Sequence, residues 1–205
     1  MRRLIPGKSI YLREARMEDA AELVRLRNQE KCQGGLSATS PEIDRQRDWL
    51  AAYAGRSAAG TERYYMICSL ENHRVLGAFR ILDVVGGSFR LGSWVIDAGA
   101  PLNAAIQTVL LAYDEMFVQG SSMECRFEVQ LGNESLLRFH PKLGAKIERE
   151  DAHEVFFVTT RADYLAARPR YQRWLTGPTQ EASPSQIEME LRVKSAIDDS
   201  TGIDG

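Results

Sequence analysis

The sequence predicts a mixed α/β (α+β) domain in which helices flank a central, mostly antiparallel sheet. Three observations carry this prediction. The middle of the chain holds three consecutive strand-like segments separated by turn signals, the pattern of an antiparallel meander. Segments with helical periodicity stand before and after the meander. At 205 residues the chain fills one domain of this kind well, whereas two full domains would be cramped.

One strand and two helices are expected before the meander. Ser9–Ala15 is strand-like, and Glu18–Asn28 has apolar residues spaced among charges as in an amphipathic helix. Gln33-Gly-Gly35 breaks that helix. A second helix is expected to begin at Ser40-Pro41-Glu42, where a capping oxygen is followed by proline at the first helical position, and to run toward Arg56.

The meander itself is expected as strands Arg63–Glu71, Arg74–Val84 and Ser88–Asp97. Asn72-His73 reads as the first turn between them, and Gly86-Gly87 is a strong signal for the second, because two glycines accept the backbone angles of a tight hairpin.

Helices and strands alternate after the meander. We expect a helix at about Leu102–Val118, a strand at Met123–Gln130, a helix at Asn133–Leu143, a strand at Glu154–Thr160 and a helix at Ala162–Leu175. The full order is therefore β-α-α-β-β-β-α-β-α-β.

Residues 1–175 are expected to form the domain, and residues 176–205 an acidic flexible tail rich in Ser, Pro, Asp and Gly. The formal net charge is −2, and six acidic residues against two basic ones give the tail −4 and leave the body +2. No strong basic field points to nucleic acid or a membrane surface as a partner. A mildly basic body suits an anionic small ligand.

The three cysteines, Cys32, Cys68 and Cys125, show neither disulfide spacing nor a CxxC pair, which favours a reducing compartment. Cys68 and Cys125 lie in apolar strand-like runs and are expected to be buried, inert thiols. The N-terminus lacks the apolar stretch of a signal peptide, and no apolar run reaches membrane-spanning length. These features predict a cytoplasmic protein.

One local motif sharpens the fold prediction. Asn133 opens a stretch in which His140 follows at a fixed offset, and Leu143-Gly144-Ala145 comes next. With the element order, this stretch resembles the GNAT superfamily of N-acyltransferases over roughly Ser9 to Tyr171. The resemblance places His140 where the family usually has tyrosine, and Leu143-Gly144-Ala145 where it usually has Leu-Gly-Phe.

The resemblance implies an enzyme that moves an acyl group from acetyl-CoA or another acyl-CoA onto a primary amine, by direct attack in a ternary complex. No cysteine has a recognisable nucleophile setting, which disfavours a covalent acyl-enzyme. Phe89–Ile96 and Arg138–Ala145 look like N-acyltransferases that modify nucleotide-linked amino sugars. A protein N-terminus or side chain is an alternative acceptor, and a non-catalytic binding module is a third reading. The sequence does not decide the oligomeric state, and a homodimer stays open.

The family's phosphate loop is altered in this chain. Gly99–Gln107 stands in its place without the usual glycine pair. A helix beginning near Asn103 would still present unpaired N–H groups to a pyrophosphate, and Ala104 and Ala105 are small enough for close approach. The cofactor contacts expected from the resemblance are Val95, Ile96, Asn103, Ala104, Ala105, Ile106, Asn133, Phe139 and Lys142.

Two side chains are candidates for catalysis. His140, as an imidazolium, could protonate the departing thiolate, or it could hydrogen-bond locally and pack against the cofactor. Glu128 could act as a water-linked base for the amine, or it could be an exposed strand glutamate. The free backbone N–H near Val95 to Asp97 is expected to face the thioester carbonyl.

The acceptor pocket is expected on the meander. Its candidate residues are Arg80, Asp83, Arg90 and Trp94, where arginines could hold a diphosphate and the indole could stack on a sugar or base. Each of these could equally be structural. His73 and His153 flank turns without ligand spacing, so no metal site is assigned.

Overall fold

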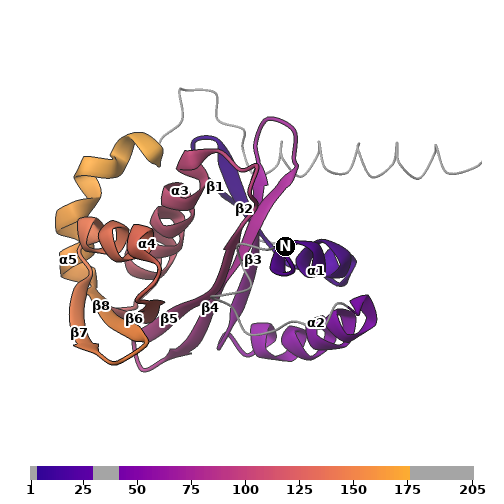
Figure 1. The fold of residues 1–205 in the computed structure, drawn as a ribbon, viewed down its shortest axis with the longest axis horizontal. Helices are drawn as coiled ribbons and strands as arrows, with labels where there is room; N and C mark the ends of the chain where they lie inside the picture. The colour runs from indigo at the N-terminus through magenta and orange to yellow at the C-terminus, as the bar shows by residue number, and fades with distance from the viewer. Residues whose placement is uncertain (1–3, 30–41, 176–205) are drawn as a thin grey trace, which may run out of the picture.

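The computed structural model describes residues 4–29 and 42–175. Their strands form one eight-stranded sheet with the order β1-β2-β3-β4-β5-β6-β8-β7 (Figure 1). Every neighbouring pair from β1 to β5 is antiparallel, as are β6–β8 and β8–β7, whereas β5 and β6 are parallel. The predicted fold class, a mixed and mostly antiparallel sheet flanked by helices, is confirmed.

The elements before the meander are β1 (Leu4–Pro6), β2 (Ile10–Glu14), a 3-10 turn (Met17–Asp19), α1 (Ala20–Arg27) and α2 (Ile43–Ala58). The short edge strand β1 was not predicted, because three residues are too few for a readable alternation. The expected helix start at Ser40-Pro41 lies outside the described residues, and Glu42 is the residue immediately before α2.

The three strands of the meander are confirmed as β3 (Arg63–Ser69), β4 (Val75–Val85) and β5 (Ser88–Ile96). Gly86 and Gly87 form the turn between β4 and β5 with φ angles of +59° and +81°. Glycine takes such angles without steric cost, which is why this turn could be read from the sequence.

After the meander come α3 (Leu102–Tyr113), its π-helical continuation Asp114–Gln119, β6 (Glu124–Gln130), α4 (Glu134–Phe139) with a 3-10 turn at His140–Leu143, β7 (Lys146–Glu150), β8 (Glu154–Thr160), and α5 (Arg161–Ala167) with a 3-10 turn at Arg168–Trp174. The edge strand β7 was missed. All its residues are exposed, so it lacks the buried alternation that marks a strand, and its charges suit an unpaired sheet edge.

The sheet has two differently covered faces. On the α2 face, helices α1 and α2 pack over β2 to β4, with Tyr64, Ala78 and Val95 pointing toward them. On the α3 face, helices α3 and α5 pack over Phe89 and Phe127, among others. Figure 1 shows α1 and α2 on one side of the sheet and α3, α4 and α5 on the other.

Cys68 on β3 and Cys125 on β6 are buried free thiols, as predicted. Burial raises the pKa of both thiols, which keeps them protonated and unreactive. Cys32 lies outside the described residues. Among the helices of the described chain, none combines the length and the apolar character that a membrane crossing requires.

Candidate active site

Strands β5 and β6 pair over only part of their lengths. Their parallel register runs from Ser88 opposite Glu124 to Arg90 opposite Arg126. β5 then continues to Ile96, whereas β6 continues in pairing with β8 alone. Residues Leu91–Ile96 therefore form an unpaired backbone edge of β5 on the side of β6, in the interior of the sheet. We call this segment the unpaired edge.

Two contacts identify the N–H group that this edge presents. The N–H of Asp97 donates to the carbonyl oxygen of Leu76 on β4 at 2.8 Å, and a Cβ on Gly77 of β4 would collide with the carbonyl oxygen of Val95. The backbone groups of Val95 and Asp97 thus face β4. Because these groups alternate sides along a strand, the N–H of Ile96 faces β6. A free backbone N–H was expected near Val95 to Asp97, and of these three residues it is Ile96 whose N–H points toward the unpaired side of β5.

A β-bulge lies at the unpaired edge. Ala78 of β4 is opposite Val95 and Arg80 is opposite Gly92, so β5 holds one residue more than β4 over this stretch. Ser93 has φ +48° there. A glycine inside a strand pattern is a known sign of a bulge, so Gly92 was the signal from which this feature could have been found.

The segment after β5 leads to the start of α3. Asp97 accepts hydrogen bonds from the N–H of Gly99 at 2.8 Å and from Gln29 at 3.1 Å, and it pairs with Arg25 of α1 at 2.7 Å. These bonds hold the segment between β5 and α3 in place, although it lacks the glycine pair that the family usually has there. They also lower the pKa of Asp97 against the opposing effect of burial.

The first turn of α3 faces solvent at Leu102, and no acidic residue lies in it. The N–H of Ala104 donates to the carbonyl oxygen of Pro101 at 2.9 Å. The N–H groups of Leu102 and Asn103 before it have no partner within the helix and carry a positive partial charge. Asn103 Oδ1 is buried and has no hydrogen-bond partner in the described chain. Ala104 was expected to contact the cofactor, but its side chain is buried in the core and does not line a ligand site. Ala105 and Ile106 are half-buried.

His140 is enclosed by aromatic rings. It is 3% exposed, and its ring centroid lies 4.3 Å from that of Phe127, 5.3 Å from Phe139 and 6.2 Å from Trp94. Burial lowers the pKa of His140 from 6.5 to about 4, because an apolar enclosure disfavours the charged ring. The expected imidazolium is therefore corrected: near neutral pH the ring is an uncharged imidazole.

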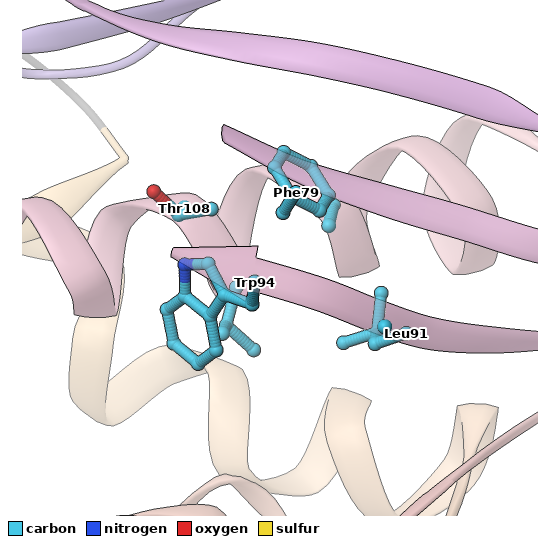
Figure 2. Close-up of a pocket in the computed structure, with 7 residues that line it drawn as sticks. Phe79, Leu91, Trp94 and Thr108 are labelled. Atoms are coloured by element: carbon cyan, nitrogen blue, oxygen red, sulfur yellow. The ribbon is translucent and has the colours of Figure 1, made fainter. Parts of the chain in front are cut away.

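Trp94 lies on the α3 face, where it packs against the core. Together with Phe79, Leu91 and Thr108 it lines a cavity of about 10 Å³ between β5 and α3 (Figure 2). Its Nε1 is buried and has no hydrogen-bond partner among the described residues. The sequence grouped Trp94 with Arg80 and Arg90, but the structure places the indole on the opposite face from those arginines.

Arg90 and Glu128 lie on the α2 face beside the last paired residues of β5 and β6. Arg90 Nη2 is 2.9 Å from both carboxylate oxygens of Glu128, and Nη1 is 3.3 Å from Asp83. Hydrogen bonds to Glu128 raise the pKa of the arginine. Glu128 is thus neither free nor randomly oriented: its carboxylate is held at the start of the unpaired edge.

Arg80 is held in a different network on the same face. Its Nε and Nη2 contact the buried carboxylate of Glu62 at 2.8 and 2.6 Å, and its guanidinium lies 4.7 Å from the ring centroid of Trp49 on α2. Its Nη1 is 3.4 Å from Ser93 Oγ. The sequence analysis missed Glu62 and Ser93, since neither belongs to a readable motif.

The residues of the motif around α4 differ in exposure and in role. Asn133 caps α4, with its Oδ1 accepting from the N–H of Leu136 at 3.2 Å. Phe139 is half-buried beside His140, and Lys142 is exposed. Within the described ranges, no group of three or more His, Cys, Asp or Glu side chains is arranged to hold a metal ion.

No protein-family model and no curated protein sequence matches the chain. Solved structures do. Apo FdhC, described as a nucleotide-linked sugar GNAT, is 28% identical with a TM-score of 0.78, over 86% of this chain and 100% of that chain. A GCN5-related N-acetyltransferase from Brucella melitensis is 16% identical with a TM-score of 0.70, over 86% of each chain. RimL, a ribosomal L7/L12 alpha-N-protein acetyltransferase, is 14% identical with a TM-score of 0.66, over 78% of this chain and 95% of that chain.

Proposed function

Because the chain belongs to the GNAT superfamily and is an acyl-CoA-dependent N-acyltransferase, we propose that its acceptor is the primary amine of a nucleotide-linked amino sugar. The observation that carries this proposal is the similarity to FdhC. It extends over the whole of that chain and is clearly higher in identity than the similarities to the other acetyltransferases compared above.

The residues around the unpaired edge fit an acyl-CoA. Trp94 Nε1, Asn103 Oδ1 and His140 Nδ1 are buried polar atoms without partners in the described chain, and such atoms normally find a hydrogen bond in the functional state. They come from β5, from the start of α3 and from the turn after α4. The N–H groups of Leu102 and Asn103, at the start of α3, suit a pyrophosphate.

The acyl donor supplies an activated thioester carbonyl, and the protein contributes donors and orientation. In the transfer, the amine nitrogen bonds to the acyl carbon, the carbon–sulfur bond breaks, the amine loses a proton and the sulfur gains one. We assign to the N–H of Ile96 a hydrogen bond to the acyl oxygen as negative charge develops on that oxygen. A fixed backbone donor of this kind is worth about 10²–10³ in rate.

Glu128 is the group that we assign to the amine proton, taken through a water molecule. Arg90 holds its carboxylate at the unpaired edge. His140 lies on the other face with its ring centroid 6.2 Å from that of Trp94. We assign to its neutral ring a hydrogen bond toward the departing sulfur, which takes its proton from water rather than from an imidazolium.

The meander arginines differ in their access to an acceptor. The Arg90 side chain is 43% exposed, whereas that of Arg80 is 20% exposed and is committed to Glu62. Arg90 and the neighbouring Asp83 are therefore the residues of this set that a diphosphate or sugar reaches from solvent. Arg80, which lies on the same face, has a supporting structural role through its ion pair with Glu62.

The test is amine-dependent release of free coenzyme A from acetyl-CoA. The pure protein is assayed with a nucleotide-linked amino sugar, the corresponding free amino sugar, spermidine and a peptide with a free N-terminus. We expect the highest kcat/KM with the nucleotide-linked amino sugar. Preference for the peptide or spermidine would overturn the proposed acceptor, and acyl-CoA binding without release by any amine would favour a binding module.

A further inference from the structure

Ser93 has an unusual backbone conformation for its place in the fold. Among the described residues, three that are not glycine have positive φ: His73 at +59°, Asp83 at +51° and Ser93 at +48°. His73 lies in a turn between strands and Asp83 near the end of β4. Ser93 lies within β5, where a side chain in the left-handed region is disfavoured. Glycine would adopt this conformation without steric cost.

The bulge brings Ser93 to the unpaired edge. β5 stops pairing with β6 after Arg90, and the bulge lies between the pairs formed by Gly92 and Val95. Ser93 is thus beside the backbone that presents the N–H of Ile96. Strained residues gather at functional sites, where the surrounding structure maintains them.

The contacts of Ser93 place its hydroxyl on the α2 face. Arg80 Nη1 lies 3.4 Å from Ser93 Oγ, and Arg80 is itself fixed through Nε and Nη2 by the buried carboxylate of Glu62. The arginine occupies one lone pair of the hydroxyl at long range. The other lone pair and the hydroxyl proton are left for a molecule that approaches from this face, on which Glu128 also lies.

Resting on the proposed function, we propose that Ser93 binds the acceptor amine. Its Oγ accepts a hydrogen bond from the amine N–H and so directs the nitrogen lone pair toward the acyl carbon held at the unpaired edge. Arg80 and Glu62 act through Ser93 as positioning residues. A bound amine that can rotate freely loses the orientation on which rate enhancement depends.

Ser93→Gly separates the hydroxyl from the backbone, because glycine keeps the positive φ while the oxygen is removed. We expect a folded protein with a melting temperature at or above that of wild type. Its kcat/KM for the amine should fall by about 10- to 100-fold, as for a hydrogen bond that counts in the transition state. The dissociation constant for acetyl-CoA should not change. Ser93→Ala should show the same kinetic loss with a lower melting temperature.

His73→Gly is the matched control, since it relieves positive φ at a residue outside the site, and its kinetics should equal those of wild type. All variants are measured with the amine that wild type uses best in the acceptor panel, so a wrong acceptor class does not affect this comparison. Wild-type kcat/KM in folded Ser93→Gly would overturn the role of the hydroxyl. A parallel loss of acetyl-CoA binding would also overturn it, by assigning Ser93 to the donor site.

Discussion

Arg90 of β5 holds both carboxylate oxygens of Glu128 of β6 at 2.9 Å, at the point where the backbones of these two strands cease to pair. The ion pair spans the beginning of the unpaired edge and continues the link between the strands through side chains. Both partners are partly exposed, so the pair adds little to stability. Its effect is to orient a carboxylate next to the unpaired edge, where we propose that acyl transfer takes place.

Glu128→Gln should therefore lower kcat by about 10²-fold or more, since the amide cannot accept the amine proton. Arg90→Ala should lower kcat through loss of that orientation, and the double variant should lose less than the product of the two single losses. Steady-state kinetics with a saturating acyl donor measure all three. Glu148→Gln, at a glutamate of exposed β7 that pairs with Arg126, is the control, and a loss equal to that of Glu128→Gln would remove the specific role.

His140 should make folding stability sensitive to acid. Its pKa is lowered to about 4 in the folded protein, so between about pH 6.5 and pH 4 the unfolded chain binds more protons at this residue. The stability contributed by the neutral ring is present above pH 6.5 and is lost as the pH falls, by at most about 1.4 kcal/mol per pH unit.

Replacing His140 with Phe keeps an aromatic ring and removes the titration, so the acid limb of the denaturant-measured free energy of unfolding should become flatter than in wild type. Parallel curves for wild type and His140→Phe would contradict the buried neutral imidazole.

Gly144 should be intolerant of a side chain. It has φ +95°, and a Cβ there would stand 2.7 Å from the carbonyl oxygen of Asp163 on α5. Gly144→Ala combines left-handed strain with a backbone clash, so it should destabilise the fold by about 1–3 kcal/mol in chemical denaturation. Gly132→Ala, where nothing lies within 4 Å of the added atom, is the comparison, and equal stability of the two variants would be the contrary result.

The fold could be predicted because its strands and helices have regular apolar periods and strong turn signals, as at Gly86-Gly87. The arrangement of the candidate site could be predicted less well, and Trp94 shows why. In a regular strand Arg90 and Trp94, four residues apart, would share a face. The bulge at Ser93 shifts the alternation by one residue, so the two side chains lie on opposite faces of the sheet. No local pattern gives the position of a bulge with that accuracy.

The same physical limit applies to His140 and Ala104. The sequence placed both near the donor, but protonation depends on which rings enclose a histidine, and the direction of an alanine depends on the rotation of its helix. Both are consequences of tertiary packing. The helix expected to begin at Asn133 does begin there, with Asn133 as its cap, because capping depends on neighbours along the chain.

Ala105, the half-buried small residue in the first turns of α3, should control access of the donor. Ala105→Trp places an indole where a pyrophosphate would approach the helix start, and we expect coenzyme A affinity measured by calorimetry to fall by about tenfold or more. Ala166→Trp on the exposed side of α5 is the control. Unchanged affinity in Ala105→Trp would place the phosphates elsewhere.

The structure of the protein in complex with acetyl-CoA or a stable thioether analogue tests the role of the unpaired edge most directly. We predict that the pantetheine arm lies along Leu91–Ile96, that the acyl oxygen is about 3 Å from the backbone nitrogen of Ile96, and that the pyrophosphate lies at the first turn of α3. A donor bound away from this edge, or an acyl oxygen that receives its hydrogen bonds from another strand, would contradict the assignment of the active site.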